Sequence, residues 1–167
     1  DGAAAYHGDQ AVIGSDGSTL FSASQAGVAI ADAGLRKVIQ TLDDADVPMA
    51  DRFLVVPPVE KKTLTGVARF TEQAYVGEIG GGNTIRNGLI GDLYGVPVYV
   101  STNSPTNNSA RACLLAHKSA MVMVEQMGVR TQTQYKQEFL GDLFTADTIY
   151  GTGELRNDAG ILIAVPT

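Results

Sequence analysis

The spacing of apolar residues predicts one long helix in the first third of the chain. Five of them recur at intervals that place them on one helical face: Val28, Leu35, Val38, Ile39 and Leu42. Ser22 and Gln25 have the spacing of a capping box, so we predict a helix over about 23–43. Gly27 and Gly34 each cost about 1 kcal/mol relative to alanine, which means that tertiary packing must hold this helix.

A short apolar run and two prolines follow the predicted helix. Arg52–Val56 is bounded by Pro57-Pro58, which predicts a buried strand that ends at the first proline. Pro58 suits the first turn of a second helix, and the charge of Glu60 complements the positive end of that helix. Gly66 is suited to end it. We therefore expect a strand and a short helix that form a small α/β unit.

The middle of the chain combines loops with one short strand. Residues 78–84 contain three consecutive glycines and are predicted to form a loop. The next strand contains Pro97, which lacks a backbone N–H. This strand must therefore lie at a sheet edge, or the proline must be among its first residues. Residues 101–111 are polar and predict an exposed, mobile loop. Three valines alternate on one face of the strand: Val96, Val98 and Val100.

The last third of the chain has the alternation of β-structure. The apolar runs 112–116 and 121–124 flank a polar triplet that fits either a hairpin turn or the middle of a buried helix, and periodicity does not decide between them. Ile161, Ile163 and Val165 share one strand face. Three strands are predicted after Val129: Gln132–Phe139, Ala146–Leu155 and Ile161–Val165.

Composition and charge narrow the classes of function. With 167 residues, 44% of them hydrophobic, the chain can build one core. Its net charge of −6 and its lack of clustered lysine and arginine argue against a protein that grips nucleic acid. No run of about 18 apolar residues predicts a membrane span. Cys113 is the single cysteine, so we expect a buried small side chain and neither an internal disulfide nor a cysteine-based metal cluster.

Candidate chemistry is weak along the whole chain. The loop Gly80–Asn83 has consecutive amides that could cradle an anion, but it lacks the lysine of a phosphate loop and the buried strand that precedes one. His7 and His117 have no partners at the spacing of a metal site. Four acidic residues gather at the end of the first helix, without the spacing of a calcium loop: Asp43, Asp44, Asp46 and Asp51. We expect no enzyme activity, no cofactor and no bound metal, and we keep a small ligand-binding or enzyme domain that uses the Gly80 loop as an alternative.

Several short motifs occur in the order in which one family has them. A helix is followed by Asp46–Pro57, which combines an acidic-x-Pro turn, an arginine and a buried strand, and then by a short helix. Gly91–Asn103 fits Gly-x-x-x-Gly-x-x-Val-x-x-Ser-x-Asn. Ala116–Ala120 follows, and Tyr150-Gly and Leu155–Asp158 come near the end. Together, from about residue 28 to 165, they resemble the major capsid protein of tailed bacteriophages.

The resemblance implies an α+β fold of the HK-97 type, in which an α/β axial domain is continuous with a β-rich peripheral domain. On this basis residues 1–21 are expected to be a loop or the remnant of an N-terminal segment, 22–128 mainly the axial domain, and 129–167 the returning strands of the peripheral domain, all in a single compact unit. The family's N-terminal arm, extended loop and spine helix are not expected in this chain. Either those parts were removed or lie outside this chain, or the chain is a trimmed core that need not assemble alone.

The function implied by the resemblance is structural. Copies of the chain would form pentamers and hexamers of an icosahedral shell that encloses double-stranded DNA without binding it specifically, with scaffold and portal proteins as further partners and no membrane. The location would be the virion capsid, assembled in the host cytoplasm. An encapsulin-like nanocompartment shares this fold and is the alternative. Contacts at the capsomer axis are expected in the segments 78–87 and 102–110, at Gly80, Gly81, Gly82, Asn83, Asn103, Pro105, Asn107 and Asn108.

Overall fold

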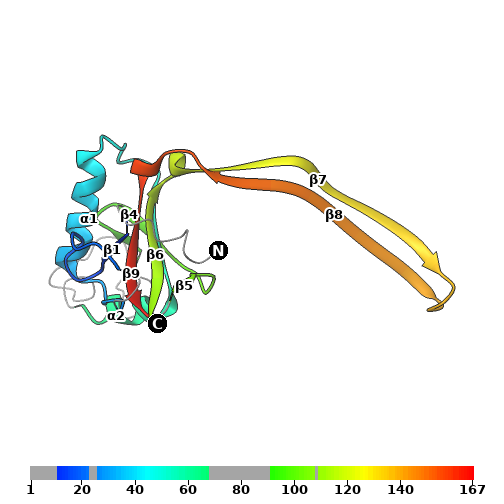
Figure 1. The fold of residues 1–167 in the computed structure, drawn as a ribbon, viewed down its shortest axis with the longest axis horizontal. Helices are drawn as coiled ribbons and strands as arrows, with labels where there is room; N and C mark the ends of the chain where they lie inside the picture. Colours follow the sequence, from blue (N-terminus) through cyan, green and yellow to red (C-terminus); the bar gives the residue numbers. More distant parts are fainter. Residues whose placement is uncertain (1–10, 23–25, 68–90, 108) are drawn as a thin grey trace. The chain divides into compact units, whose positions relative to one another are not determined.

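The computed structural model describes residues 11–22, 26–67, 91–107 and 109–167. Their contacts divide the chain into two compact units. One unit contains the chain up to Ala120 together with Arg156–Thr167, and the other is Met121–Leu155 (Figure 1). The predicted domain bounds 1–21, 22–128 and 129–167 stay a prediction, and by its contacts the last segment, Arg156–Thr167, belongs to the first unit.

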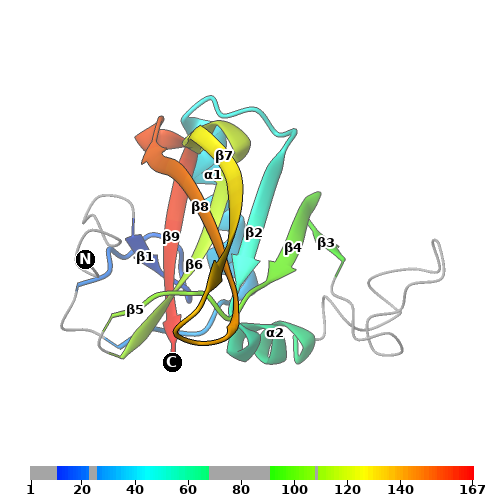
Figure 2. The ribbon, with the colours of Figure 1, turned by 90° about the vertical axis from the view of Figure 1, so that its right-hand side faces the viewer.

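A mixed, seven-stranded sheet forms the centre of the first unit. Its order is β1-β9-β6-β2-β4-β3, with β5 paired to β6 (Figure 2). The pairs β1/β9 and β2/β4 are parallel and the others are antiparallel. The strands are β1 (Ala11–Ile13), β2 (Arg52–Val56), β3 (Asp92–Leu93), β4 (Val96–Val100), β5 (Thr106–Asn107), β6 (Ala110–His117) and β9 (Gly160–Pro166).

One hydrophobic core joins this sheet to the two helices, α1 (Asp32–Asp44) and α2 (Pro58–Thr65). Cross-strand register puts Leu54 opposite Leu115, and Leu115 opposite Ile161, so these side chains share the face that enters the core. The helices contribute four fully buried residues to it: Leu35, Val38, Leu42 and Leu64. The predicted common face of Ile161, Ile163 and Val165 is confirmed, since all three are buried in this core.

Helix α1 begins at Asp32, nine residues later than predicted from the apolar spacing. The described residues 26–31 before it are not helical and bond to β9 and to the residue before β6. The Gly27 N–H donates to the Ser109 carbonyl (3.3 Å) and the Val28 N–H to the Ala164 carbonyl (3.2 Å). A Cβ on Gly27 would lie 2.0 Å from the Val165 oxygen. These long-range bonds satisfy the backbone groups that a helix would otherwise pair.

The strand and helix predicted around the double proline are confirmed. β2 ends at Val56, Pro58 is the first residue of α2, and Gly66 is its C-cap. Pro97 is the second residue of β4, as the restriction on prolines in strands requires, and it lies opposite Asp92. In the stretch expected to be only a loop or arm, by contrast, residues 11–13 form β1 against β9.

The second unit is a two-stranded antiparallel hairpin made of β7 (Met121–Lys136) and β8 (Gly141–Glu154). A short 3-10 turn, Lys118–Ala120, separates β6 from β7, so the two apolar runs around it are strands and not a helix. The all-β prediction for this region is confirmed, with longer strands than expected. At the tip, Leu140 adopts a left-handed backbone conformation (φ 48°).

Candidate assembly surfaces

Residues 101–105 form a polar surface loop held at its base by main-chain hydrogen bonds. The Ser101 N–H donates to the Val56 carbonyl (3.0 Å), and the Ala112 N–H donates to the Pro105 carbonyl (3.1 Å). The Ser104 hydroxyl also donates to the Ala112 carbonyl. The loop is therefore attached to β2 and β6, and its position follows from the central sheet.

The structure describes only some of the residues expected at the capsomer axis. Asn103 and Pro105 are exposed in this loop, and Asn107 lies in β5 opposite Ala110. Asn108 and the four residues Gly80–Asn83 lie outside the described residues. Their role at an axis stays a prediction.

The hairpin exposes many large apolar side chains. The most exposed are Phe139 (80%) and Leu140 (82%) at its tip. Nine others are at least half exposed: Met121, Met123, Val124, Val129, Tyr135, Phe144, Ile149, Tyr150 and Leu155. The sequence predicted strands here, but it did not predict this exposure. Alternation of apolar and polar residues does not show whether another layer covers the strands. A two-stranded sheet is marginally stable by itself, and clustered exposed apolar side chains mark an interaction surface.

Polar contacts within the hairpin stabilise its backbone. The Arg130 guanidinium contacts both carboxylate oxygens of Asp147, at 2.9 and 3.4 Å. The Thr148 hydroxyl donates to the Met127 carbonyl (2.9 Å), where the strand register shifts. The ion pair is exposed, so it contributes at most about 1 kcal/mol.

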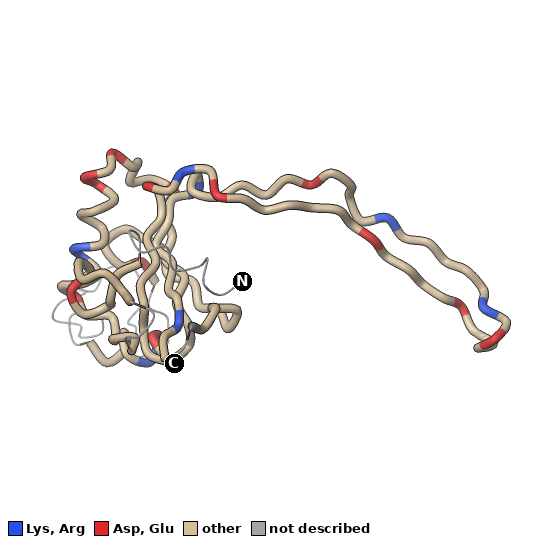
Figure 3. Tube along the Cα trace, in the orientation of Figure 1, with Lys and Arg blue, Asp and Glu red and all other residues tan. Residues whose placement is uncertain are grey.

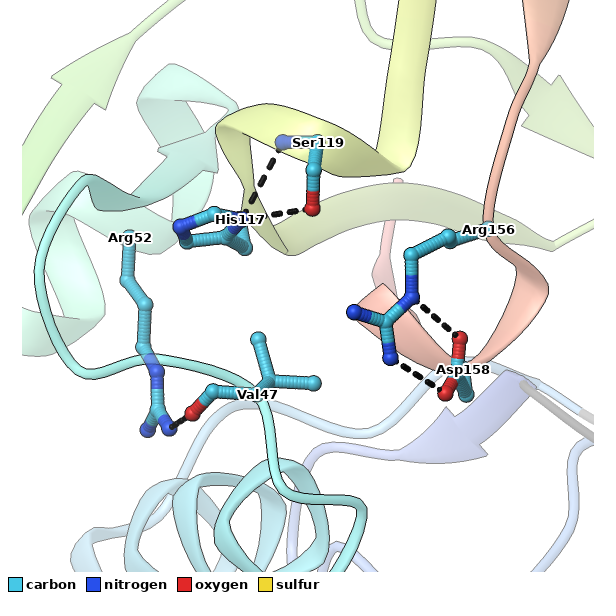
Figure 4. A network of polar contacts seen from close by, with 6 residues as sticks. All are labelled: Val47, Arg52, His117, Ser119, Arg156 and Asp158. Atoms are coloured by element: carbon cyan, nitrogen blue, oxygen red, sulfur yellow. Dashed lines mark hydrogen bonds and ion pairs between the residues drawn. The ribbon is translucent and has the colours of Figure 1, made fainter.

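A buried arginine organises the turn between α1 and β2. Arg52 is 4% exposed, and it donates from Nη2 to the Val47 carbonyl (2.5 Å), as Figure 4 shows. It also donates from Nε to the Pro48 carbonyl (2.9 Å). The same guanidinium pairs with Asp43 at 2.6 Å. One member of the acidic group thus has a structural partner. Among the residues that the structure describes, no three His, Cys, Asp or Glu side chains gather as metal ligands.

His117 and Ser119 form a local turn contact that superficially resembles a catalytic pair. The ring Nδ1 lies 2.7 Å from the Ser119 hydroxyl and 3.1 Å from the Ser119 N–H (Figure 4). Because the N–H can only donate, Nδ1 accepts, which assigns the ring proton of a neutral His117 to Nε2. The residues are two positions apart, so the contact closes the turn after β6, as predicted for His117.

The charges of the first unit form local pairs. Arg156 donates from Nε and Nη2 to the two carboxylate oxygens of Asp158, at 3.2 and 2.7 Å (Figure 4). The hydrogen bonds from Arg156 lower the pKa of Asp158, and those to Asp158 raise the pKa of Arg156. Figure 3 shows lysine and arginine scattered along the described chain and not gathered in one patch. No helix in the described ranges is long and apolar enough to span a membrane.

Solved structures with a similar fold include shell proteins. The chain matches a structure of the bacteriophage PhiM1 mature capsid (18% identity, TM-score 0.65) over 79% of its own length and 45% of that chain. A chain of Mycobacterium phage Che8 matches with 23% identity and a TM-score of 0.68, over 83% and 52%. The SrpI encapsulin complex of Synechococcus elongatus PCC 7942 matches with 14% identity and a TM-score of 0.54, over 96% and 54%. At these identities the likeness shows the fold alone, and it confirms the predicted α+β fold of the HK-97 type.

The chain spans about half the length of these solved structures. No curated protein matches it. A family model described as phage capsid protein matches residues 2–163, which is nearly the whole chain. This chain therefore belongs to the phage capsid protein family.

Proposed function

We propose that this chain is the shell-forming part of a major capsid protein, many copies of which assemble as pentamers and hexamers into an icosahedral capsid. The observation that carries the proposal is the family match over residues 2–163. The exposed apolar side chains of β7 and β8 support it, because a lattice of neighbouring subunits would cover them. In such a shell, one surface of each subunit contacts a different surface of the next, and rotation about the axis closes the ring.

The two units support an assignment of the parts of the subunit. We propose the first unit as the axial domain and the β7/β8 hairpin as peripheral-domain structure. The net charge of −6 and the scattered basic residues suit a wall that encloses double-stranded DNA without gripping it. Assembly in the host cytoplasm, with scaffold and portal proteins as partners, is part of the same proposal.

We test this proposal by expressing the complete reading frame that contains the chain and imaging the product by electron microscopy. Uniform closed shells or capsomer rings are the expected result. A monodisperse small particle at high concentration would contradict the proposal and would direct attention to ligand binding by the Gly80–Asn83 loop.

The match to an encapsulin over 96% of the chain favours one second candidate, a nanocompartment shell. Both candidates predict closed shells, so the contents decide between them. Double-stranded DNA extracted from shells isolated from the native source supports the capsid, and an enclosed cargo enzyme without DNA supports the nanocompartment.

We also propose that the loops 78–87 and 102–110 meet at the capsomer axis. Exposed polar loops adapt to either five or six neighbours, and Asn103 and Pro105 are exposed as this role requires. Replacing Gly80–Asn83 in the full-length protein with four glutamates should therefore reduce capsomer yield at least tenfold, because like charges would meet around the axis.

Size-exclusion chromatography and negative-stain imaging measure this yield. The matched control is a replacement of the same four residues with serines, which keeps the length and adds no charge. Normal shells from the glutamate variant would show that this loop does not lie at the capsomer axis.

A further inference from the structure

Glu60 is a buried carboxyl group in the core of the first unit. It lies in the first turn of α2 and is 0% exposed, unlike most glutamates in proteins. Its position was expected only to complement the helix end, which a solvent-exposed carboxylate would also do. Its complete burial therefore needs a separate explanation.

The two carboxyl oxygens have unequal surroundings. Oε2 accepts a 3.0 Å hydrogen bond from the N–H of Ile30, thirty residues earlier in the chain. Oε1 is buried and accepts no hydrogen bond, and no cationic side chain of the described residues pairs with the group. An ionised carboxylate in such a place lacks the solvation that water or a cation would provide.

This environment favours the neutral form of the carboxyl group. Burial raises the pKa of Glu60, while the hydrogen bond from Ile30 opposes the rise. Burial also raises the pKa of the neighbouring Cys113 on β6, and the negative charge of Glu60 raises it further, so Cys113 stays a neutral thiol.

The elements packed around Glu60 bring few ionisable groups. Residues 26–31 and β9 contain none. β6 contributes Arg111, Cys113 and His117, and of these the charge of Glu60 acts on Cys113. In β2, Arg52 is engaged with Asp43 and with main-chain carbonyls. At the start of α1, Asp32 is paired with Arg36 at 3.0 Å. Lys61 and Lys62 follow on α2 itself and form no ion pair with Glu60.

We propose that Glu60 is a proton-dependent latch: while its carboxyl group is neutral, α2 and Ile30 stay tied together in the core. Loss of the proton favours opening of this contact, because the cost of burying the charge outweighs the stronger hydrogen bond that a carboxylate accepts from Ile30. The tied segment, residues 26–31, also bonds through Gly27 to the Ser109 carbonyl and through Val28 to the Ala164 carbonyl. The latch thus connects α2 to a segment that bonds to β9 at Ala164 and to Ser109, the residue before β6. This inference stands on the core of the chain and is independent of the proposed function.

The pH dependence has a defined sign. The pKa of Glu60 is higher in the folded state than in the unfolded state, where it has its ordinary value of 4.5. Such a group contributes its full stabilisation to the fold at pH values below 4.5. That contribution is lost as the pH rises from 4.5 through the folded pKa. The latch is therefore closed in acid and weakens as the solution becomes more basic.

Urea unfolding of the wild-type chain and of Glu60→Gln between pH 4 and pH 9 tests the latch. Glutamine keeps a carbonyl that accepts the Ile30 N–H but does not ionise. Above pH 4.5 the unfolding equilibrium constant of the wild type should rise relative to that of the variant, by at most about tenfold per pH unit. Amide hydrogen exchange should show Ile30 losing protection with pH in the wild type but not in Glu60→Gln.

Glu154→Gln, which changes an exposed glutamate on β8, is the matched control and should follow the wild type. Parallel stability curves for the wild type and Glu60→Gln would overturn the latch. If Glu60→Gln does not fold, the carbon-13 carboxyl resonance of Glu60 in the wild type decides. Titration above pH 4.5 together with loss of Ile30 protection supports the proposal, and titration at or below 4.5 overturns it.

Discussion

Replacing Gly34 with alanine is expected to destabilise the protein by about 2 kcal/mol or more, the cost of overpacking where the neighbour cannot move. In an ordinary helix the same change stabilises by up to about 1 kcal/mol. Here a Cβ on Gly34 would lie 2.1 Å from the carbonyl oxygen of Gly14. The turn after β1 packs directly on α1 at this point, since a Cβ on Gly17 would likewise lie 2.3 Å from the Gly34 oxygen. The added Cβ would clash with a main-chain oxygen, so no movement of a neighbouring side chain can relieve the clash.

Thermal and urea unfolding of Gly34→Ala measure this effect. Gly153→Ala on β8 is the control, because no atom lies within 4 Å of its added Cβ, and its stability should change by less than about 1 kcal/mol. A Gly34→Ala protein as stable as the wild type would mean that α1 and the Gly14 turn do not approach so closely in solution.

Replacing Arg52 with leucine is expected to cost about 3 kcal/mol of unfolding free energy. The side chain is buried and donates to the main-chain carbonyls of Val47 and Pro48, which would lose their partners. Each buried acceptor left without a hydrogen bond costs about 1–3 kcal/mol. The turn between α1 and β2 would lose the contacts that hold its position.

The matched variant Asp43→Asn separates the ion pair from the hydrogen bonds. Asp43 is partly exposed and the guanidinium would keep both carbonyl acceptors, so its loss should cost about 1 kcal/mol or less. Urea denaturation of the two variants under identical conditions provides the comparison. If Asp43→Asn costs as much as Arg52→Leu, then the ion pair, and not the main-chain contacts, organises this turn.

Local signals were sufficient for several elements of the fold. β2 and α2 were predicted because Pro57 and Pro58 end a strand and begin a helix through their own restricted backbone. Prolines act within one or two residues, so no tertiary information was needed. The strands of the last third were predicted for a related reason, since alternation of side chains follows directly from strand geometry.

Other features depended on contacts between distant segments. The helix predicted from residue 23 begins at Asp32, because the segment before it exchanges helical hydrogen bonds for bonds to Ser109 and Ala164. The runs 112–116 and 121–124 looked equivalent in the sequence. The first is mostly buried in β6, whereas the second is exposed in β7, and only the packing around each strand distinguishes them.

The sequence by itself determined the family, through the order of its short motifs, and most strands and helices, through residue preferences that act locally. Tertiary structure alone decided where α1 starts, that the last strand returns to the first sheet, and that the β7/β8 hairpin forms a separate unit. It also placed Glu60 in the core with one oxygen bonded to Ile30. The physical reason is that the burial or exposure of a residue depends on which distant segments pack against it. A local sequence pattern does not contain that information.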